Sequence, residues 1–260
     1  ELQQESARGL PGLVITLPWA AGGHLHNAAA LVADGRADFR FKHELPNYGV
    51  FDEKRVFTPG PLPDPVIFRG ISIGLPICED IWCPDAAAHL AGAGAKLLLV
   101  PNGSPFEVEK FHQRLDLARQ RVSECGLPLT YVNQVGGQDE LVFDGGSFVM
   151  HREGTLGHLL PFWQEALEIS RWHERGDGWR CDGDARKGRE TLGFRRLRRG
   201  SARLDGIFDQ PRAPLHLHHR LASGPGRGGP RRVGRFADES PGPRSTRAGP
   251  NCGTMNAVAT

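Results

Sequence analysis

The feature that most constrains this chain is a change in the pattern of apolar residues near Trp179. Before it, short β-rich runs alternate with amphipathic stretches and turns, which indicates layers of strands and helices. After it, residues 190–260 are dense in Gly, Pro, Ser and Arg. Such a composition buries too little apolar surface to offset chain entropy. We therefore predict an α/β domain over residues 1–180 and a disordered basic tail over residues 190–260.

The charge follows the same division. The whole chain carries a net charge of only +2. Residues 188–260 hold fourteen Arg, no Lys and five acidic residues, a net charge of +9, whereas residues 1–187 carry −7. A basic, Gly-rich segment can bind nucleic acid through phosphate contacts. However, aromatic residues such as Phe208 and Phe236 are few there for base stacking, so we do not expect a nucleic-acid partner.

Several further features bear on location and metal binding. The sequence has no run of about 18 apolar residues and no basic-then-apolar N-terminus, so we expect neither a membrane span nor a signal peptide. The five cysteines are an odd number and are scattered, which favours a reducing, cytoplasmic setting over a disulfide framework. The spacing of Cys78 and Cys83 is not typical of a zinc site, and we predict no metal.

The local patterns predict individual elements. The expected hairpin turns are Asp34-Gly35 and Arg69-Gly70, each between apolar segments. An apolar stripe with helical spacing predicts a helix from about Pro105 to Cys125, with Lys, Gln and Arg beside the stripe. The other expected elements are strands at 13–17, 39–41, 66–77, 96–102, 129–135 and 147–150 and a helix at 85–92.

Cys78 raises the main question about function. It follows an apolar, strand-like run and precedes Glu79 and Asp80. A cysteine between a strand and a helix lies near the helix N-terminus, which favours the thiolate, but the two carboxylates oppose it. On local chemistry alone, a buried structural cysteine is the stronger interpretation.

Four longer segments favour the nucleophile. They are FKHELPNYGVFDEKRVF (residues 41–57), ICEDIW (77–82), NGSPFEVEKFHQR (102–114) and YVNQVGGQDELVFDGGSF (131–148). In this order and spacing they resemble the glutaminase domain of glutamine-dependent NAD(+) synthetases, a branch of the nitrilase (carbon–nitrogen hydrolase) superfamily. The resemblance covers roughly residues 10–180 and implies a nitrilase-like αββα sandwich, here incomplete.

The resemblance also implies roles for individual residues. Cys78 matches the nucleophile, Lys42 the catalytic lysine, and Glu53 a supporting glutamate. The implied contacts to the amino-acid end of glutamine are Tyr48, Ser104 and Lys110. Each residue has an ordinary alternative as well. Lys42 could be a solvated lysine, Tyr48 a packing aromatic, Ser104 a helix N-cap, and Glu53 a partner of Arg55.

The sequence departs from the family in two ways. The family's general-base glutamate lies upstream of the lysine motif, and no comparable acidic turn precedes Lys42. Losing that base is expected to slow turnover by about 10²–10⁴-fold, so activity is left open. The SGG-x-DS loop of the synthetase domain, to which ATP and Mg²⁺ belong, has no counterpart after residue 180.

The expected partners follow from the same resemblance. They are L-glutamine as substrate, a synthetase domain or intact homologous subunits, and further copies in a homo-oligomer. No cofactor is implied for the glutaminase step. Two other classes remain open: a free-standing amidase of the superfamily, and a non-catalytic remnant or subunit.

Overall fold

The computed structural model describes residues 1–9, 11–176, 178–182 and 216–217. The chain divides into two units, residues 1–219 and 220–260, and the second lies outside the described residues. The predicted disordered tail also lies outside them, apart from His216–Leu217, so its disorder stays a prediction.

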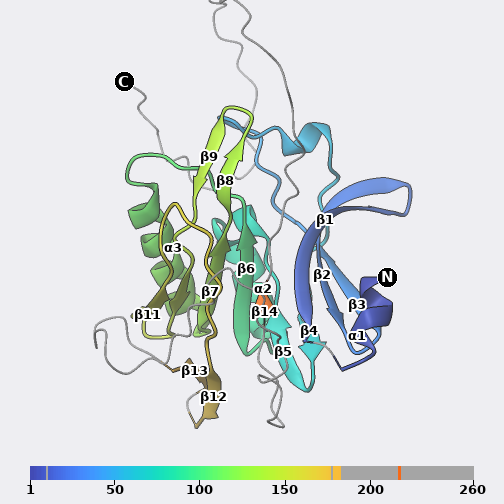
Figure 1. Cartoon of the computed structure of the whole chain (residues 1–260), viewed down its shortest axis with the longest axis vertical. Coiled ribbons are helices and arrows are strands. Elements are labelled where there is room, and N and C mark those ends of the chain that lie inside the picture. Colours follow the sequence, from blue (N-terminus) through green and yellow to red (C-terminus); the bar gives the residue numbers. More distant parts are fainter. Residues whose placement is uncertain (10, 177, 183–215, 218–260) are drawn as a thin grey trace, which may run out of the picture. The chain divides into compact units, whose positions relative to one another are not determined.

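Two main sheets form the first unit (Figure 1). The four-stranded sheet has the order β14-β1-β2-β3, with β1 at Leu13–Ala21, β2 at His24–Ala33, β3 at Arg36–Phe41 and β14 at His216–Leu217. The six-stranded sheet has the order β11-β10-β7-β6-β5-β4. Its strands are β4 Val66–Phe68, β5 Ile71–Gly74, β6 Leu97–Asn102, β7 Leu129–Asn133, β10 Phe148–Met150 and β11 Leu156–Leu159.

The remaining elements are short apart from one helix. Two separate hairpins are formed by β8 Val135–Gln138 with β9 Leu141–Asp144, and by β12 Trp172–Arg175 with β13 Gly178–Cys181. The helices are α1 Leu2–Ser6, α2 Pro84–Gly92 and α3 Lys110–Cys125, together with the 3₁₀ turns η1 Glu53–Arg55 and η2 Cys78–Ile81.

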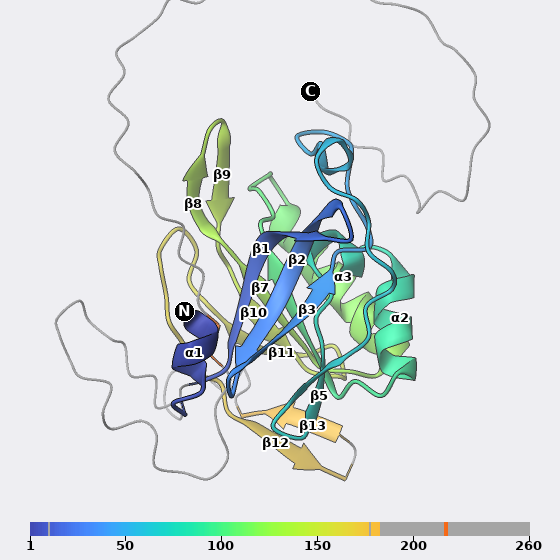
Figure 2. The ribbon, with the colours of Figure 1, turned by 90° about the vertical axis from the view of Figure 1, so that its right-hand side faces the viewer.

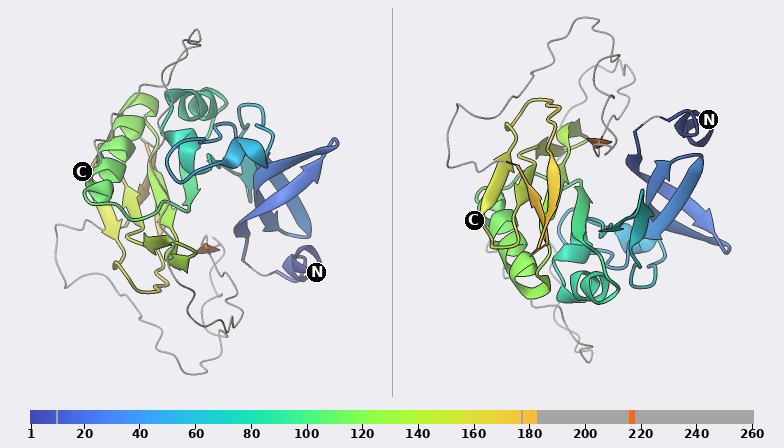
Figure 3. Two further views of the ribbon diagram at one scale, coloured as in Figure 1. Left: turned by 90° about the horizontal axis from the view of Figure 1, so that it is seen from above. Right: turned by 90° about the horizontal axis from the view of Figure 1, so that it is seen from below.

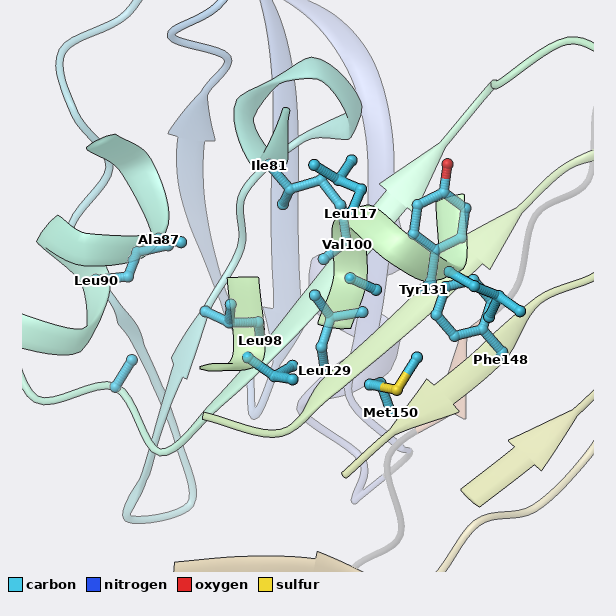
Figure 4. Close-up of a cluster of buried hydrophobic side chains, with 14 residues drawn as sticks. Ile81, Ala87, Leu90, Leu98, Val100, Leu117, Leu129, Tyr131, Phe148 and Met150 are labelled. Carbon is cyan, nitrogen blue, oxygen red and sulfur yellow. The ribbon is translucent and has the colours of Figure 1, made fainter. Parts of the chain in front are cut away.

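Two apolar cores hold the layers together. In the first, α2 and α3 cover one face of the six-stranded sheet; its centre includes Leu90, Leu98, Ala118 and Tyr131 (Figure 4). In the second, side chains of β1 and β2 pack against β4, β5 and β6 on the opposite face of that sheet. Seen from above and from below, the structure shows this order of helices, sheet and sheet (Figure 3). In the side view, β1, β2 and β3 lie in front of the six-stranded sheet (Figure 2). These layers confirm the predicted incomplete αββα arrangement.

Local turn chemistry explains the hairpins. Asp34 and Gly35 both have positive φ, as do Arg69 and Gly70, which matches the twist that two-residue hairpins require. Both predicted turns are therefore confirmed. Gly126, with a φ of 68°, ends α3 in the left-handed conformation that glycine adopts readily.

The start of the long helix differs from the prediction. The sequence suggested a helix from about Pro105, but α3 begins at Lys110, after Glu109 in the left-handed conformation. The predicted stripe does face the core, because Leu115, Ala118 and Val122 are buried.

Candidate active site

The site lies where the carboxyl ends of strands from both sheets meet. Strands β5, β6 and β7 are parallel, so their carboxyl ends share one edge of the six-stranded sheet. Cys78 follows β5, and Ser104 follows β6. Lys42 directly follows β3 of the other sheet. Carboxyl ends of parallel strands are where open α/β sheets usually bind ligands.

Lys42 and Glu53 form a close ion pair inside this region. Lys42 Nζ lies 2.6 Å from Glu53 Oε1, and the side chains are 1% and 19% exposed. Asn27 Nδ2 donates to the other carboxylate oxygen at 3.2 Å. The structure therefore excludes a solvated Lys42, and Glu53 pairs with Lys42, whereas Arg55 pairs with Asp52.

Cys78 occupies a strained turn. Its φ is 48°, a conformation that costs a residue with a side chain roughly 1–2 kcal/mol. Asp80 holds this turn, because its buried carboxylate accepts hydrogen bonds from the backbone amides of Ile77, His43 and Glu44 at 2.8–3.0 Å. The same carboxylate thus joins the Cys78 turn to the segment just after Lys42.

The groups around Cys78 act in opposite directions on the pKa of its thiol. Burial raises the pKa of its thiol, although the residue as a whole is only partly buried. Lys42 lowers that pKa, Glu79 and Glu53 raise it, and the backbone amide of Gly103 lowers it as a hydrogen-bond donor. Lys42 and Glu53 therefore lie close enough to Cys78 to act on its ionisation.

Polar groups of both signs surround this thiol. The Tyr48 hydroxyl donates to Glu79 Oε1 at 2.6 Å, and partial burial raises the pKa of both groups. Lys110 Nζ lies 3.3 Å from the Glu107 carboxylate and 5.2 Å from the centre of the Trp82 ring. Lys42 and Lys110 both lower the pKa of Glu79. The predicted residues Tyr48 and Lys110 thus share one electrostatic environment with Cys78.

Ser104 is buried beside this group. It is 4% exposed, its amide donates to Asn133 Oδ1 at 2.9 Å, and its hydroxyl accepts from Arg114 Nε at 3.1 Å. It does not cap α3, whose N-cap is Glu109. Tyr48 is 56% exposed and meets Phe51 edge-on, so it is not simply a packing aromatic.

Several residues around the site were not predicted. The sequence suggested only that Asp80 opposes a thiolate, whereas its charge is satisfied by three backbone amides. The arginines of α3 were expected beside the apolar stripe, but Arg114 and Arg121 are buried. In the sequence each arginine directly precedes a residue of the apolar stripe, and this position was the signal that could have predicted its burial. His26 is buried as well, at 8% exposure, and its Nδ1 hydrogen-bonds the Thr58 carbonyl.

Two features are absent from the part of the chain that the structure describes. Within it, no group of three or more His, Cys, Asp or Glu side chains has a metal-binding arrangement. Among the same residues, every helix is too short or too polar to cross a bilayer.

Known proteins resemble this chain over the same region. Residues 2–171 match the carbon-nitrogen hydrolase family. The glutamine-dependent NAD(+) synthetase of Rhodobacter capsulatus is 46% identical over 172 residues, which cover 66% of this chain and 31% of that protein. The corresponding protein of Xanthomonas campestris is 45% identical over 150 residues, which cover 56% and 27%. This chain thus spans between a quarter and a third of the length of the curated relatives it matches.

Solved structures resemble the fold as well. A glutamine-dependent NAD+ synthetase from Acinetobacter baumannii, in complex with ADP, aligns with a TM-score of 0.62 and 36% identity. That alignment covers 67% of this chain and 34% of the synthetase. An amidase from Nesterenkonia, with acrylamide added at its active-site cysteine, aligns with a TM-score of 0.54 and 30% identity over 62% of this chain and 63% of the amidase. The family match covers well over half of the chain, which therefore belongs to the carbon-nitrogen hydrolase family.

Proposed function

We propose that this chain carries a glutamine-hydrolysing site that supplies ammonia, with Cys78 as nucleophile. The observation that carries the proposal is the buried Lys42–Glu53 pair, which acts electrostatically on a cysteine at the carboxyl edge of the sheet. A buried cation beside a thiol is the arrangement that favours a thiolate at neutral pH.

The chemistry would proceed in two steps. The Cys78 sulfur attacks the side-chain amide carbon, and the negative charge that develops on the amide oxygen lies within reach of Lys42. The C–N bond breaks, ammonia leaves with the proton given up by the thiol, and a thioester remains. Water then attacks the thioester, which gives glutamate and restores the thiol.

Glu53 would keep Lys42 oriented, since Lys42 Nζ and Glu53 Oε1 are 2.6 Å apart. Glu53 and Glu79 are the described carboxylates whose charges act on the thiol, and both already have partners in the structure. We therefore expect attack on an activated analogue to be faster than complete turnover of glutamine.

The other groups suit an amino acid bound by its polar end. Lys110 offers a cation and Ser104 a hydroxyl for the α-carboxylate. Glu79 offers a carboxylate for the α-ammonium group, with Tyr48 fixing its orientation through the 2.6 Å hydrogen bond. Recognition of a zwitterion requires both signs of charge, and the site supplies both.

The wider assignments extend this proposal. The two NAD(+) synthetases above extend well beyond the region that this chain matches. We propose that the ammonia serves such a synthetase domain or homologous subunits, which would hold the ATP and Mg²⁺. We further propose that the glutaminase step needs no cofactor, and that the chain acts in the cytoplasm as a homo-oligomer.

The test is to measure ammonia and glutamate released from L-glutamine by the full chain and by its Cys78→Ala variant. Equal release of both products that depends on Cys78 supports the proposal. Release that continues undiminished in Cys78→Ala would contradict it.

A free-standing amidase is the second candidate. The resemblance to the solved Nesterenkonia amidase favours it, because that alignment covers similar shares of both chains. The two candidates differ in substrate. Faster release of ammonia from propionamide or acrylamide than from glutamine would favour the amidase, since these amides offer nothing for Glu79 and Lys110 to bind.

A further inference from the structure

Three residues of the motifs that define the site have no part in the proposed chemistry. They are Arg114, Asn133 and Asp144, at 0%, 6% and 3% exposure. Burying a guanidinium and a carboxylate in a protein interior is costly unless their geometry and hydrogen bonds compensate. A side chain this costly to bury needs a structural or functional reason.

All three guanidinium nitrogens of Arg114 donate hydrogen bonds within this interior. Nη1 contacts both Asp144 carboxylate oxygens, at 2.8 and 3.0 Å. Nη2 donates to the carbonyls of Ser104 and Pro105 at 2.9 and 3.0 Å, and Nε donates to Ser104 Oγ at 3.1 Å. Three of the five hydrogen bonds therefore hold the segment that follows β6, whereas two hold the counter-ion.

Asn133, at the end of β7, holds the same segment from the other side. Its Oδ1 accepts from the Ser104 amide at 2.9 Å, and its Nδ2 donates to the Ser104 carbonyl at 3.2 Å. The backbone of Ser104 is thus fixed at both of its polar groups, and its side chain is fixed by Arg114.

The fixed segment adjoins Cys78. Gly103 immediately precedes Ser104, and its amide acts on the Cys78 sulfur as a hydrogen-bond donor. A displacement of Ser104 would move this amide, because Gly103 is joined directly to Ser104 in the chain. The same displacement would move the Ser104 hydroxyl, which the proposed function places at the substrate.

We propose that Arg114 is a positioning residue, which locks residues 103–105 so that the Gly103 amide faces the Cys78 sulfur and Ser104 is set for substrate. The proposal rests on the proposed function for the substrate part only. The alternative is a purely structural role, in which the Arg114–Asp144 pair stabilises the fold without setting the geometry at Cys78.

The variant Arg114→Lys separates these roles. It keeps a positive charge beside Asp144, but one ammonium group cannot replace the planar fork that spans Asp144, Ser104 and Pro105. The matched control is Arg119→Lys on the same helix, because Arg119 is 47% exposed and its guanidinium hydrogen-bonds the exposed Asp116.

Two rates are measured on the full chain. The first is alkylation of Cys78 by iodoacetamide against pH, followed by the mass of the Cys78 peptide because Cys125 and Cys181 also carry free thiols. The charges that act on this thiol, Lys42, Glu53 and Glu79, are unchanged in both variants. The second is labelling by a chloroketone analogue of glutamine, analysed for affinity and for maximal rate.

For Arg114→Lys we expect the alkylation midpoint to rise by about one pH unit and the efficiency of analogue labelling to fall about tenfold. These are the effects of losing one hydrogen bond to a charged group. Arg119→Lys should change neither rate. A folded Arg114→Lys protein that matches the wild type in both rates would overturn the proposal.

Should Arg114→Lys fail to fold, the double variant Arg114→Met/Asp144→Leu takes its place, since replacing a whole buried ion pair by apolar groups is often tolerated. The same two shifts are expected, and their absence in the folded double variant overturns the proposal. The two proposals can also be separated. If the wild type is not labelled by the glutamine analogue but the variant still shifts the alkylation profile of Cys78, the proposed function is contradicted and the positioning role of Arg114 stands.

Discussion

Replacing Lys42 by methionine tests whether its charge serves the chemistry or only the fold. The substitution keeps the length of the side chain and removes the cation that lies 2.6 Å from Glu53 Oε1. Among the residues that the structure describes, the Glu53 carboxylate then keeps Asn27 as its hydrogen-bond partner, at 3.2 Å. Stability and reactivity should both fall, for different reasons.

Stability should fall because the Glu53 carboxylate loses its counter-ion. Breaking a fully buried ion pair costs about 3–5 kcal/mol. Because Glu53 is 19% exposed, we expect about 2–3 kcal/mol, a fall in Tm of roughly 5–10 °C for a domain of this size. The double variant Lys42→Met/Glu53→Gln should recover most of this loss, since a neutral amide needs no counter-ion.

The loss of reactivity should recover only in part in the double variant. Lys42 lowers the pKa of the Cys78 thiol against the effect of burial, and a neighbouring opposite charge is typically worth about one to three pKa units. Lys42→Met should therefore show alkylation of Cys78 by iodoacetamide moved to higher pH by at least about one unit. The double variant should show a smaller shift in the same direction, because it also removes Glu53, which raises the pKa of this thiol less than Lys42 lowers it. A double variant that regains both stability and the wild-type alkylation profile would refute the reasoning, because Lys42 would then act only through the fold.

Three further predictions concern the surrounding turns. Burial raises the pKa of Asp80 to about 6, above its unfolded value near 4. The contribution of Asp80 to stability should therefore fall as the pH rises from about 4 to 6. Across that window, the free energy of unfolding of the wild type relative to Asp80→Asn should drop by about 2–3 kcal/mol. Cys78→Gly should be more stable than Cys78→Ala by about 1 kcal/mol in urea unfolding, because the φ of 48° strains alanine and suits glycine. Tyr48→Phe should lower labelling by the glutamine analogue about 3–10-fold without moving the iodoacetamide profile, since it removes the hydrogen bond to Glu79 and leaves Lys42 in place.

Local rules predicted the parts of the fold that depend on neighbouring residues. The turns at Asp34-Gly35 and Arg69-Gly70 need only positive φ at adjacent positions, and both form as expected. The strand that ends before Cys78 follows from its apolar run. The family resemblance then predicted which residues gather near Cys78, and the structure brings Lys42, Glu53 and Tyr48 into its electrostatic environment.

Long-range contacts account for what was missed. Ser104 before Pro105 has the sequence of a helix N-cap, but its amide and hydroxyl bond Asn133 and Arg114, so the helix begins five residues after Pro105. Periodicity describes apolar faces and says nothing of buried charge. Arg114 and Arg121 are buried because distant carbonyls accept their hydrogen bonds, those of Ser104 and Pro105 for the first and of Ile81 for the second.

The most direct test of the account is covalent labelling of the full chain by the chloroketone analogue of glutamine, read by intact mass beside Cys78→Ala. The account predicts a single adduct on the wild type, blocked by excess L-glutamine and absent from Cys78→Ala. A folded wild-type chain that takes up no label, or a label that persists in Cys78→Ala, would contradict the assignment of Cys78 as the nucleophile of a glutamine site.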